Sequence, residues 1–229
     1  MFRLRASQEQ SRCIRHCLSH ESFQCRFDPR VTATILLVRH AQHVEFGAVL
    51  SGRRRDVALS PEGLEQAAIV SDLLGTTSLA AVYSSPRERA WYTAREIAEP
   101  HELKVTAEDR LDELDFGGWT GCSFAELEGD PLWSSWNEER ASARPPGGES
   151  MAEATERAFQ FLTEAAAEHA GDTVLAVSHC DIIRGVIARC LGLSLDNLLR
   201  FDVDPASISR IAIGQWGTRV LSINERLYQ

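Results

Sequence analysis

The hydrophobic residues of this chain form two short runs that each lead to a histidine. Residues 35–38 are apolar and are followed by Arg39 and His40, and residues 174–177 are apolar and lead through one serine to His179. Such continuous runs are typical of strands that are buried on both faces of a parallel sheet. Ligands collect at the carboxyl ends of such strands. The pattern therefore predicts an anion site at that edge of the sheet.

The remaining pattern alternates strands with helices. A helix is predicted from Ser60-Pro61 to about Leu74, because serine is a good N-cap and proline suits the first turn. Further strands are predicted at 79–83, 104–106, 207–213 and 218–223, and further helices at 86–98, 150–169 and 181–191. The last two strands should form a hairpin. The alternation predicts an α/β fold, a three-layer α/β/α sandwich with a mostly parallel central sheet.

Residues 111–148 break this alternation and are expected to be irregular. The segment contains three tryptophans, Trp119, Trp133 and Trp136, together with Phe124 and several glycines and prolines. Such a composition suits the wall or lid of a pocket, but it is equally consistent with core packing. The sequence leaves both interpretations open.

Residues 1–30 differ from the rest, because they are rich in arginine and show no sustained period. We expect a mobile basic extension, or upstream sequence, followed by a catalytic domain over 31–229. Cys13, Cys17, His20 and Cys25 offer a weak alternative, a zinc site, although their spacing matches no standard zinc pattern.

Composition narrows the function classes. The chain has 229 residues and a net charge of −9, which argues against a general binder of nucleic acids or membrane surfaces. No apolar stretch reaches membrane-spanning length. The six cysteines lack the spacing of a disulfide framework. We therefore expect a cytoplasmic protein with no nucleic-acid or membrane partner.

The residues at the predicted sheet edge suggest phosphate chemistry. A neutral, immobilised imidazole is a good nucleophile toward phosphorus, and His40 has Arg39 beside it. Arg89 lies one turn into a predicted helix, where it could point back at the strand ends, and Arg87 competes with it for that role. His179 could stabilise charge in the transition state. Each residue taken alone is also consistent with a surface salt bridge or a strand-end cap.

A phosphatase that uses histidine also needs a partly desolvated carboxylic acid for the leaving group. Asp112, Glu113 and Asp115 precede a glycine turn, and any of the three could serve. Cys180 is not a plausible nucleophile, because a cysteine phosphatase needs five residues between Cys and Arg and only three separate Cys180 from Arg184.

Taken together, the motifs resemble the histidine phosphatase superfamily, the phosphoglycerate mutase-like group. The matching segments, in chain order, are Arg39-His40-Ala41, 56–67, 83–90, 113–121, 146–150 and 177–179. The similarity extends from about Thr34 to the C-terminus and implies the α/β/α sandwich that the alternation predicts. It also implies a reaction that needs no cofactor and no metal.

The resemblance implies roles for the candidate residues. His40 is similar to the nucleophile that becomes phosphohistidine, and Glu113 to the proton donor, with Asp112 and Asp115 as substitutes. The phosphate-binding candidates are Arg39, Arg89, His179 and His43.

Three departures from the family pattern concern possible ligand contacts. His43 stands where the family often has Thr or Ser, and Cys180-Asp181 replaces a common glycine. The spacing from Gly52 to Asp56 is one residue longer than in many members and contains the three arginines 53–55. His43 could contact phosphate or face the pocket rim. Arg53 and Cys180 are candidate substrate contacts, although a solvated loop would explain the arginines equally well.

The expected activity is that of a phosphomonoesterase that hydrolyses a small phosphorylated metabolite. Phosphoglycerate mutase or sugar-bisphosphatase activity is the alternative within the family. Residues 114–148 lack the Gly-Leu-Asn-Lys segment of cofactor-dependent mutases, which favours the phosphatase. An alternative of another class is a non-catalytic phospho-ligand-binding or regulatory module. The sequence identifies neither the substrate nor the oligomeric state.

Overall fold

The computed structural model describes residues 31–226 and contains one six-stranded sheet. The strand order is β3-β2-β4-β1-β5-β6. The strands are β1 (Thr32–Arg39), β2 (Ala81–Ser84), β3 (Val105–Ala107), β4 (Thr173–Ser178), β5 (Ile208–Gly214) and β6 (Gly217–Glu225). β1 to β4 run parallel to one another, whereas β5 is antiparallel to β1 and forms an antiparallel hairpin with β6 at one edge. The sheet is therefore mostly parallel, as the sequence predicts.

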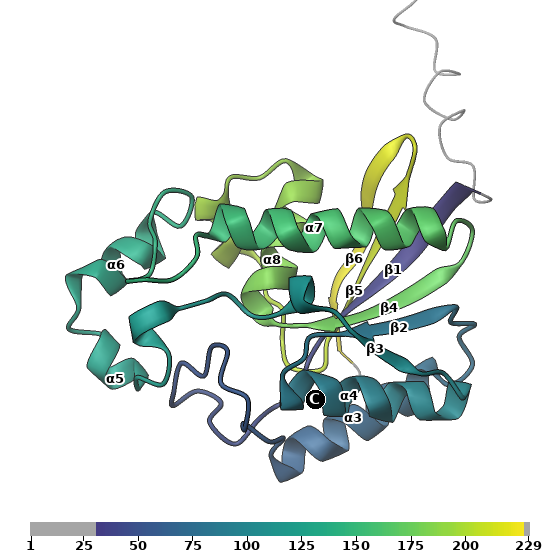
Figure 1. Ribbon diagram of the computed structural model, residues 1–229, viewed down its shortest axis with the longest axis horizontal. Coiled ribbons are helices and arrows are strands. Elements are labelled where there is room, and N and C mark those ends of the chain that lie inside the picture. The colour runs from purple at the N-terminus through teal and green to yellow at the C-terminus, as the bar shows by residue number, and fades with distance from the viewer. Residues whose placement is uncertain (1–30, 227–229) are drawn as a thin grey trace, which may run out of the picture.

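Four long helices cover the two faces of the sheet (Figure 1). They are α3 (Pro61–Leu74), α4 (Glu88–Ala98), α7 (Met151–Glu168) and α8 (Cys180–Leu191). Alternation along β1 explains the layers, because Ile35 and Leu37 pack on the α7/α8 side whereas Leu36 and Val38 pack on the α3/α4 side. The three-layer α/β/α prediction is confirmed.

Local signals in the sequence explain where these helices begin. Ser60 caps α3 by accepting a hydrogen bond from the backbone N–H of Gly63, and Pro61 is the first helical residue. Ser150 and Glu153 form the expected capping box of α7. The helix expected from Pro86 instead begins at Glu88, because Arg87 has an extended backbone conformation.

The expectation that residues 111–148 are irregular is only partly correct. The segment contains the helices α5 (Phe124–Leu127) and α6 (Pro131–Glu138), and the single 3-10 turn η4 (Gly117–Trp119). Both helices carry cap signals in the sequence, a capping box at Ser123 for α5 and Asp130-Pro131 for α6. Both helices are too short to show a helical period in the sequence, so the hydrophobic pattern does not predict them.

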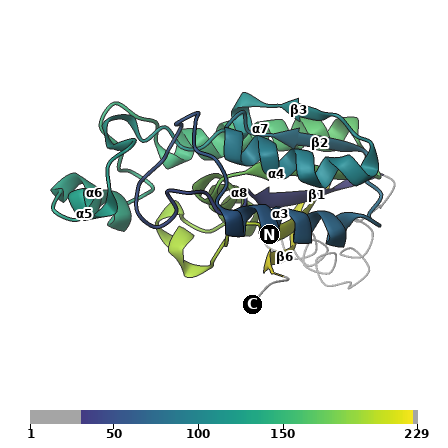
Figure 2. The ribbon, with the colours of Figure 1, turned by 90° about the horizontal axis from the view of Figure 1, so that it is seen from below.

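The remaining 3-10 turns are η2 (Glu99–His101), η3 (Asp109–Leu111) and η5 (Leu195–Arg200). The segment 41–60 lies between the sheet and the α5/α6 region in both ribbon views (Figures 1 and 2). It is pressed against the start of α3, where a Cβ on Gly63 would lie 1.9 Å from the Gln42 carbonyl oxygen. A side chain at position 63 would therefore displace the chain that follows His40.

Across the described residues, no helix has both the length and the apolar character that crossing a membrane requires. The predicted basic extension and the alternative zinc site fall in residues 1–30, outside the described part of the chain.

Candidate active site

The two strand-end histidines meet at the carboxyl edge of the sheet. His40 directly follows β1, and His179 follows β4 as the N-cap residue of α8. Because β1 and β4 are adjacent parallel strands with Arg39 opposite Ser178, their ends lie side by side. The two imidazole rings are 5.0 Å apart between centroids, and both side chains are buried.

Hydrogen bonds hold the His40 ring in one tautomer. Its Nδ1 lies 2.8 Å from the carbonyl oxygen of Ala41. Since a carbonyl can only accept, Nδ1 carries the proton and Nε2 keeps a free lone pair. Burial, helped by the positive charges of Arg89 and Arg39, holds the pKa of His40 well below its ordinary value. The imidazole is therefore neutral at physiological pH, the form in which it is nucleophilic.

Arg89 joins the two histidines from the first turn of α4. Its side chain is buried, with the residue 2% exposed. Nε donates to His40 Nε2 at 3.3 Å, and Nη2 lies 3.2 Å from His179 Nδ1 and 2.7 Å from the Gly52 carbonyl oxygen. The guanidinium thus presents a fixed positive charge beside the unprotonated Nε2 of His40, where an anion could bind in place of this long hydrogen bond.

His179 is oriented by a chain of hydrogen bonds through Ser85. Because Nδ1 accepts from Arg89, Nε2 carries the proton and donates to Ser85 Oγ at 2.7 Å. Ser85 Oγ in turn donates to Asp112 Oδ1 at 3.2 Å. Burial and the charge of Arg89 hold the pKa of His179 well below its ordinary value, so this ring is also neutral.

Of the three candidate acids, Glu113 is the one that lines the cavity together with His40 and His43. Its Oε2 lies 3.8 Å from His179 Nδ1, and its Oε1 accepts from the backbone N–H of Leu114. Burial, with a smaller contribution from the negative charge of Asp181, raises the pKa of Glu113 to about 7. Glu113 is therefore poised to give up or take a proton near neutral pH.

The other two acids are committed elsewhere. Asp112 Oδ2 forms an ion pair with Arg87 Nη2 at 2.7 Å, which also removes Arg87 from the pocket. Asp115 is largely exposed and accepts a hydrogen bond from the backbone N–H of Gly117. Neither one lines the cavity.

A cage of charged side chains fixes the backbone of Glu113. Arg53 Nε and Arg157 Nη2 donate to the Glu113 carbonyl oxygen at 2.7 and 3.0 Å. Glu149 binds both guanidiniums and also accepts from the N–H of Asp115. Arg53 does not line the cavity, so the expectation of a substrate contact is corrected to a supporting position behind Glu113.

The cavity around these groups has a volume of about 370 Å³. Arg39, His43 and Cys180 line it, as the sequence analysis anticipated for the phosphate-binding and substrate-contact candidates. Arg39 Nη1 donates to the Val203 carbonyl oxygen, and its Nε has no hydrogen-bond partner among residues 31–226. Burial and the nearby arginines lower the pKa of His43 to about 4.

Aromatic side chains are divided between this cavity and the core. Phe124 and Trp133 line the cavity, whereas Trp119 and Trp136 are buried in the hydrophobic core. Both interpretations of the aromatic segment therefore apply, each to different residues.

Sequence reasoning missed several residues of the site. Ser85 and Glu149 lie inside the recognised motifs at 83–90 and 146–150, which is a signal that could have found them. Asn137, Arg140 and Asp181 also line the cavity. Asn137 and Arg140 belong to no motif, and only the folding of α6 against α8 brings them there.

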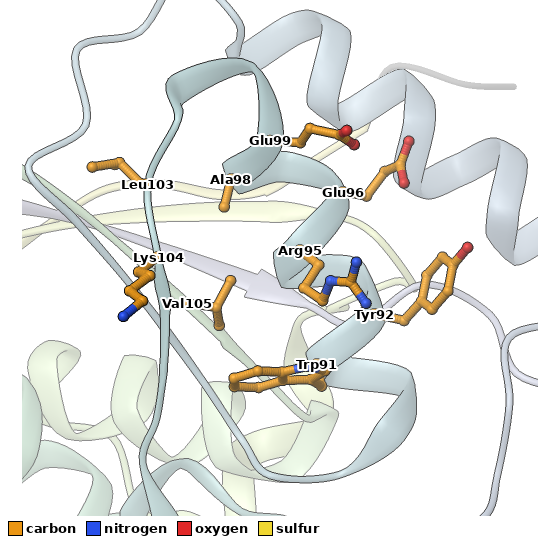
Figure 3. A pocket seen from close by; sticks show the side chains of 9 residues that line it. All are labelled: Trp91, Tyr92, Arg95, Glu96, Ala98, Glu99, Leu103, Lys104 and Val105. Carbon is orange, nitrogen blue, oxygen red and sulfur yellow. The ribbon is translucent and has the colours of Figure 1, made fainter.

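A larger hollow, of about 600 Å³, lies between α4 and β3 (Figure 3), and neither His40 nor His179 is among its lining residues. We call it the α4–β3 groove. Trp91, Arg95 and Tyr92 reach into it from α4, and Lys104 and Val105 face them from the β3 side. None of its lining residues belongs to the hydrogen-bonded centre described above, so the smaller cavity is the candidate active site. Within residues 31–226, no three His, Cys, Asp or Glu side chains gather as a metal site would require.

Comparison with known proteins agrees with this geometry. The model of the histidine phosphatase superfamily (branch 1) matches residues 35–226. Phosphoserine phosphatase 1 of Hydrogenobacter thermophilus is 36% identical over 195 residues, which cover 83% of this chain and 91% of that protein. The adenosylcobalamin/alpha-ribazole phosphatase of Escherichia coli is 28% identical over 193 residues, covering 83% and 95%.

The fold is also shared with solved phosphatases. The native structure of mycobacterial glucosyl-3-phosphoglycerate phosphatase superposes with a TM-score of 0.76 at 26% identity, covering 85% of this chain and all of that one. The match to the family model, the similarity to phosphatases of known sequence and the shared fold lead to one conclusion: the chain belongs to the histidine phosphatase superfamily and is a phosphatase.

Proposed function

We propose that this phosphatase hydrolyses a small phosphorylated metabolite through a phosphohistidine formed at Nε2 of His40. The observation that carries the proposal is the buried, neutral His40, whose free Nε2 lies beside the Arg89 guanidinium in a cavity that also contains Glu113. Nucleophile, positive charge and a carboxyl group with a pKa of about 7 are thus within one small cavity.

The phosphate group of the substrate binds to the positive and N–H-bearing side chains around His40. Arg89 and Arg39 supply charge, His43 supplies a neutral imidazole, and His179 accepts from Arg89 and so holds that guanidinium in place. These groups are held in place before the substrate arrives, so they stabilise the negative charge of the transferring phosphoryl group with little reorganisation.

In the first step, the lone pair of His40 Nε2 attacks phosphorus, and the bond between phosphorus and the ester oxygen breaks. The leaving oxygen takes the bonding electrons and receives the proton of the Glu113 carboxylic acid. Protonation matters because an alkoxide is a poor leaving group. The products of this step are a free alcohol, phosphohistidine and the Glu113 carboxylate.

In the second step, the Glu113 carboxylate takes a proton from water while the water oxygen attacks phosphorus. The P–N bond breaks and its electrons return to His40 Nε2. Inorganic phosphate leaves, and His40 is neutral and Glu113 protonated once more. The cycle thus restores both groups.

The test is hydrolysis of p-nitrophenyl phosphate in the presence of a chelator, combined with acid-lability analysis of the phosphorylated protein. His40→Ala should abolish turnover and phosphoprotein formation. Arg95→Ala, in the α4–β3 groove, is the matched control and should retain both. A phosphoprotein that persists in His40→Ala would overturn the nucleophile assignment.

A wild-type protein that binds phosphate esters but releases no phosphate would instead favour the non-catalytic binding module. Transfer of phosphate to a second hydroxyl in place of water would favour the mutase. The substrate panel should include phosphoserine, alpha-ribazole phosphate and glucosyl-3-phosphoglycerate, after the activities named for the relatives.

A further inference from the structure

The side of the cavity formed by α6 and the residues after it contains a charged group that the proposed reaction does not use. Arg140 follows α6, lines the same cavity as His40 and is only 7% exposed. Its guanidinium lies over the ring of Trp136, 5.1 Å from the centroid. Burying an arginine costs free energy, because the cation loses its water, unless a partner compensates its charge.

Arg140 is only partly satisfied by the protein. Nη1 donates to Asp181 Oδ1 at 3.0 Å and Nη2 donates to Asn137 Oδ1 at 2.9 Å. Nε is buried and has no hydrogen-bond partner in the part of the chain that the structure describes. A guanidinium carries five N–H donors, so donors remain for a ligand. Both neighbours, Asn137 and Asp181, line the cavity as well.

Resting on the proposed function, we propose that Arg140, held by Asn137 and Asp181, is a specificity-determining subsite that binds a carboxylate on the alcohol part of the substrate. The substrate class is then a phosphorylated hydroxy acid or hydroxy amino acid. Its phosphate would bind at His40 and its carboxylate at Arg140.

The size of the cavity fits this assignment. A sphere of the cavity's volume, 370 Å³, is about 9 Å across, which is the span of a small metabolite. A molecule with a few bonds between phosphate and carboxylate could therefore reach both ends. Apolar residues such as Leu50 and Trp133 also line the cavity and suit the carbon atoms between the two groups.

Charge favours a carboxylate over a second phosphate. The cation of Arg140 is already paired with the anion of Asp181 at 3.0 Å, so the pair has little net charge. A dianionic phosphate would bring two negative charges close to Asp181, whereas a carboxylate brings one and matches the planar fork of arginine. Asp181 could also accept a hydrogen bond from a neighbouring ammonium or hydroxyl group of the substrate. The subsite therefore argues against a sugar bisphosphate.

Matched pairs of substrates test the subsite without any mutation. O-phosphoserine carries a carboxylate that O-phosphoethanolamine lacks, and 3-phosphoglycerate has a carboxylate where glycerol 3-phosphate has a hydroxymethyl group. We expect kcat/KM to favour the carboxylate member of each pair by about 10- to 100-fold, the range for a hydrogen bond to a charged group. Equal values within both pairs would overturn the subsite.

Variants then assign the preference to Arg140. In Arg140→Met the ratio of kcat/KM within each pair should fall toward one, mostly through KM, whereas Arg140→Lys should keep part of it. Arg95→Met makes the same chemical change in the α4–β3 groove and should leave the ratio as in the wild type. A ratio that survives Arg140→Met in folded protein would contradict the proposal.

If circular dichroism shows that Arg140→Met does not fold, Asn137→Ala serves in its place, because Asn137 is only half-buried and should lower the ratio several-fold. Every rate is normalised to that variant's hydrolysis of p-nitrophenyl phosphate, which has no carboxylate. This reference separates the two failures. A wild-type enzyme that hydrolyses p-nitrophenyl phosphate but shows no carboxylate preference refutes the subsite alone, whereas absence of His40-dependent hydrolysis refutes the proposed function.

Discussion

The two sides of the active-site cavity are built from different kinds of chain segment. The imidazole centre, which we define as His40, Arg89, Glu113 and His179, comes from two strand ends, the first turn of α4 and the loop after η3. The α6 wall, which we define as Trp133, Asn137 and Arg140, comes from the long insertion between β3 and α7.

The two parts also differ in how completely they are hydrogen-bonded. In the imidazole centre each ring is fixed by two partners, such as Ala41 and Arg89 for His40. The α6 wall leaves Arg140 Nε without a partner in the described residues. A fully bonded centre is preorganised for one reaction, whereas a partly bonded wall has donors left for a substrate. The difference suggests that chemistry and selectivity can be changed separately.

The largest effect expected to sharpen this comparison is that of Glu113→Gln. Removing the acid should lower kcat by about 10²- to 10⁴-fold for alkyl phosphates, whose alkoxide needs a proton, and much less for p-nitrophenyl phosphate. Steady-state kinetics with esters of graded alcohol pKa measure this. If both kinds of ester lose rate equally, Glu113 does not protonate the leaving group.

Arg89→Ala should lower kcat/KM by about 10²- to 10³-fold, because it removes positive charge from the transferring phosphoryl group. Unlike the loss in Glu113→Gln, this loss should be the same for every substrate. Arg95→Ala, on the exposed side of the same helix, is the matched control. A loss that varied with the alcohol part of the substrate would show that Arg89, in the imidazole centre, also contributes to substrate selectivity.

The dependence of kcat/KM on pH should come from the imidazole centre and not from the α6 wall. The pKa of Glu113 is raised to about 7, and the first step needs its protonated form. For alkyl phosphates, kcat/KM should therefore fall as pH rises above about 7, by roughly tenfold per pH unit. The pKa of His40 lies well below its ordinary value of 6.5, so His40 stays neutral as the pH falls to that value. We therefore expect no fall in kcat/KM near pH 6.5.

Glu113→Gln should remove the alkaline fall of the profile, and Arg140→Lys should leave it in place. An alkaline fall that persists in Glu113→Gln would assign that titration to another group.

The smallest effect is expected from Trp133→Ala in the α6 wall. The side chain lines the cavity and packs edge-on against Trp119, with the ring centroids 5.3 Å apart. Its loss should raise KM several-fold for aryl phosphates relative to glycerol 3-phosphate, because apolar contact area is lost. Trp91→Ala in the α4–β3 groove is the matched control. A fall in kcat for all substrates would show that the wall also supports the centre.

Much of the fold could be predicted because its signals are local. The buried runs at 35–38 and 174–177 identified β1 and β4, and the caps Ser60 and Ser150 identified the starts of α3 and α7. The short helices α5 and α6 escaped prediction because four to eight residues are too few to show a helical period. Their caps were the better signal.

The candidate site divides in the same way. The phosphate-binding candidates Arg39, His43 and Arg89 line one cavity, and His179 contacts Arg89. Arg53 was expected to contact substrate because it is an extra arginine near the pocket. Its position behind Glu113 depends on Glu149, which is 96 residues away in the chain, so no local pattern could have revealed it.

The sequence by itself determined the sheet edge and the kind of chemistry, because two strands that each end in a histidine must bring those histidines to one edge when the strands lie parallel. The tertiary structure decided which of three neighbouring acids is desolvated, which of two arginines enters the pocket, and that Arg140 comes to lie beside Asp181. These outcomes depend on burial and on partners from distant segments. Protonation and selectivity are therefore properties of the packed molecule, whereas the placement of the nucleophile follows from the order of residues along the chain.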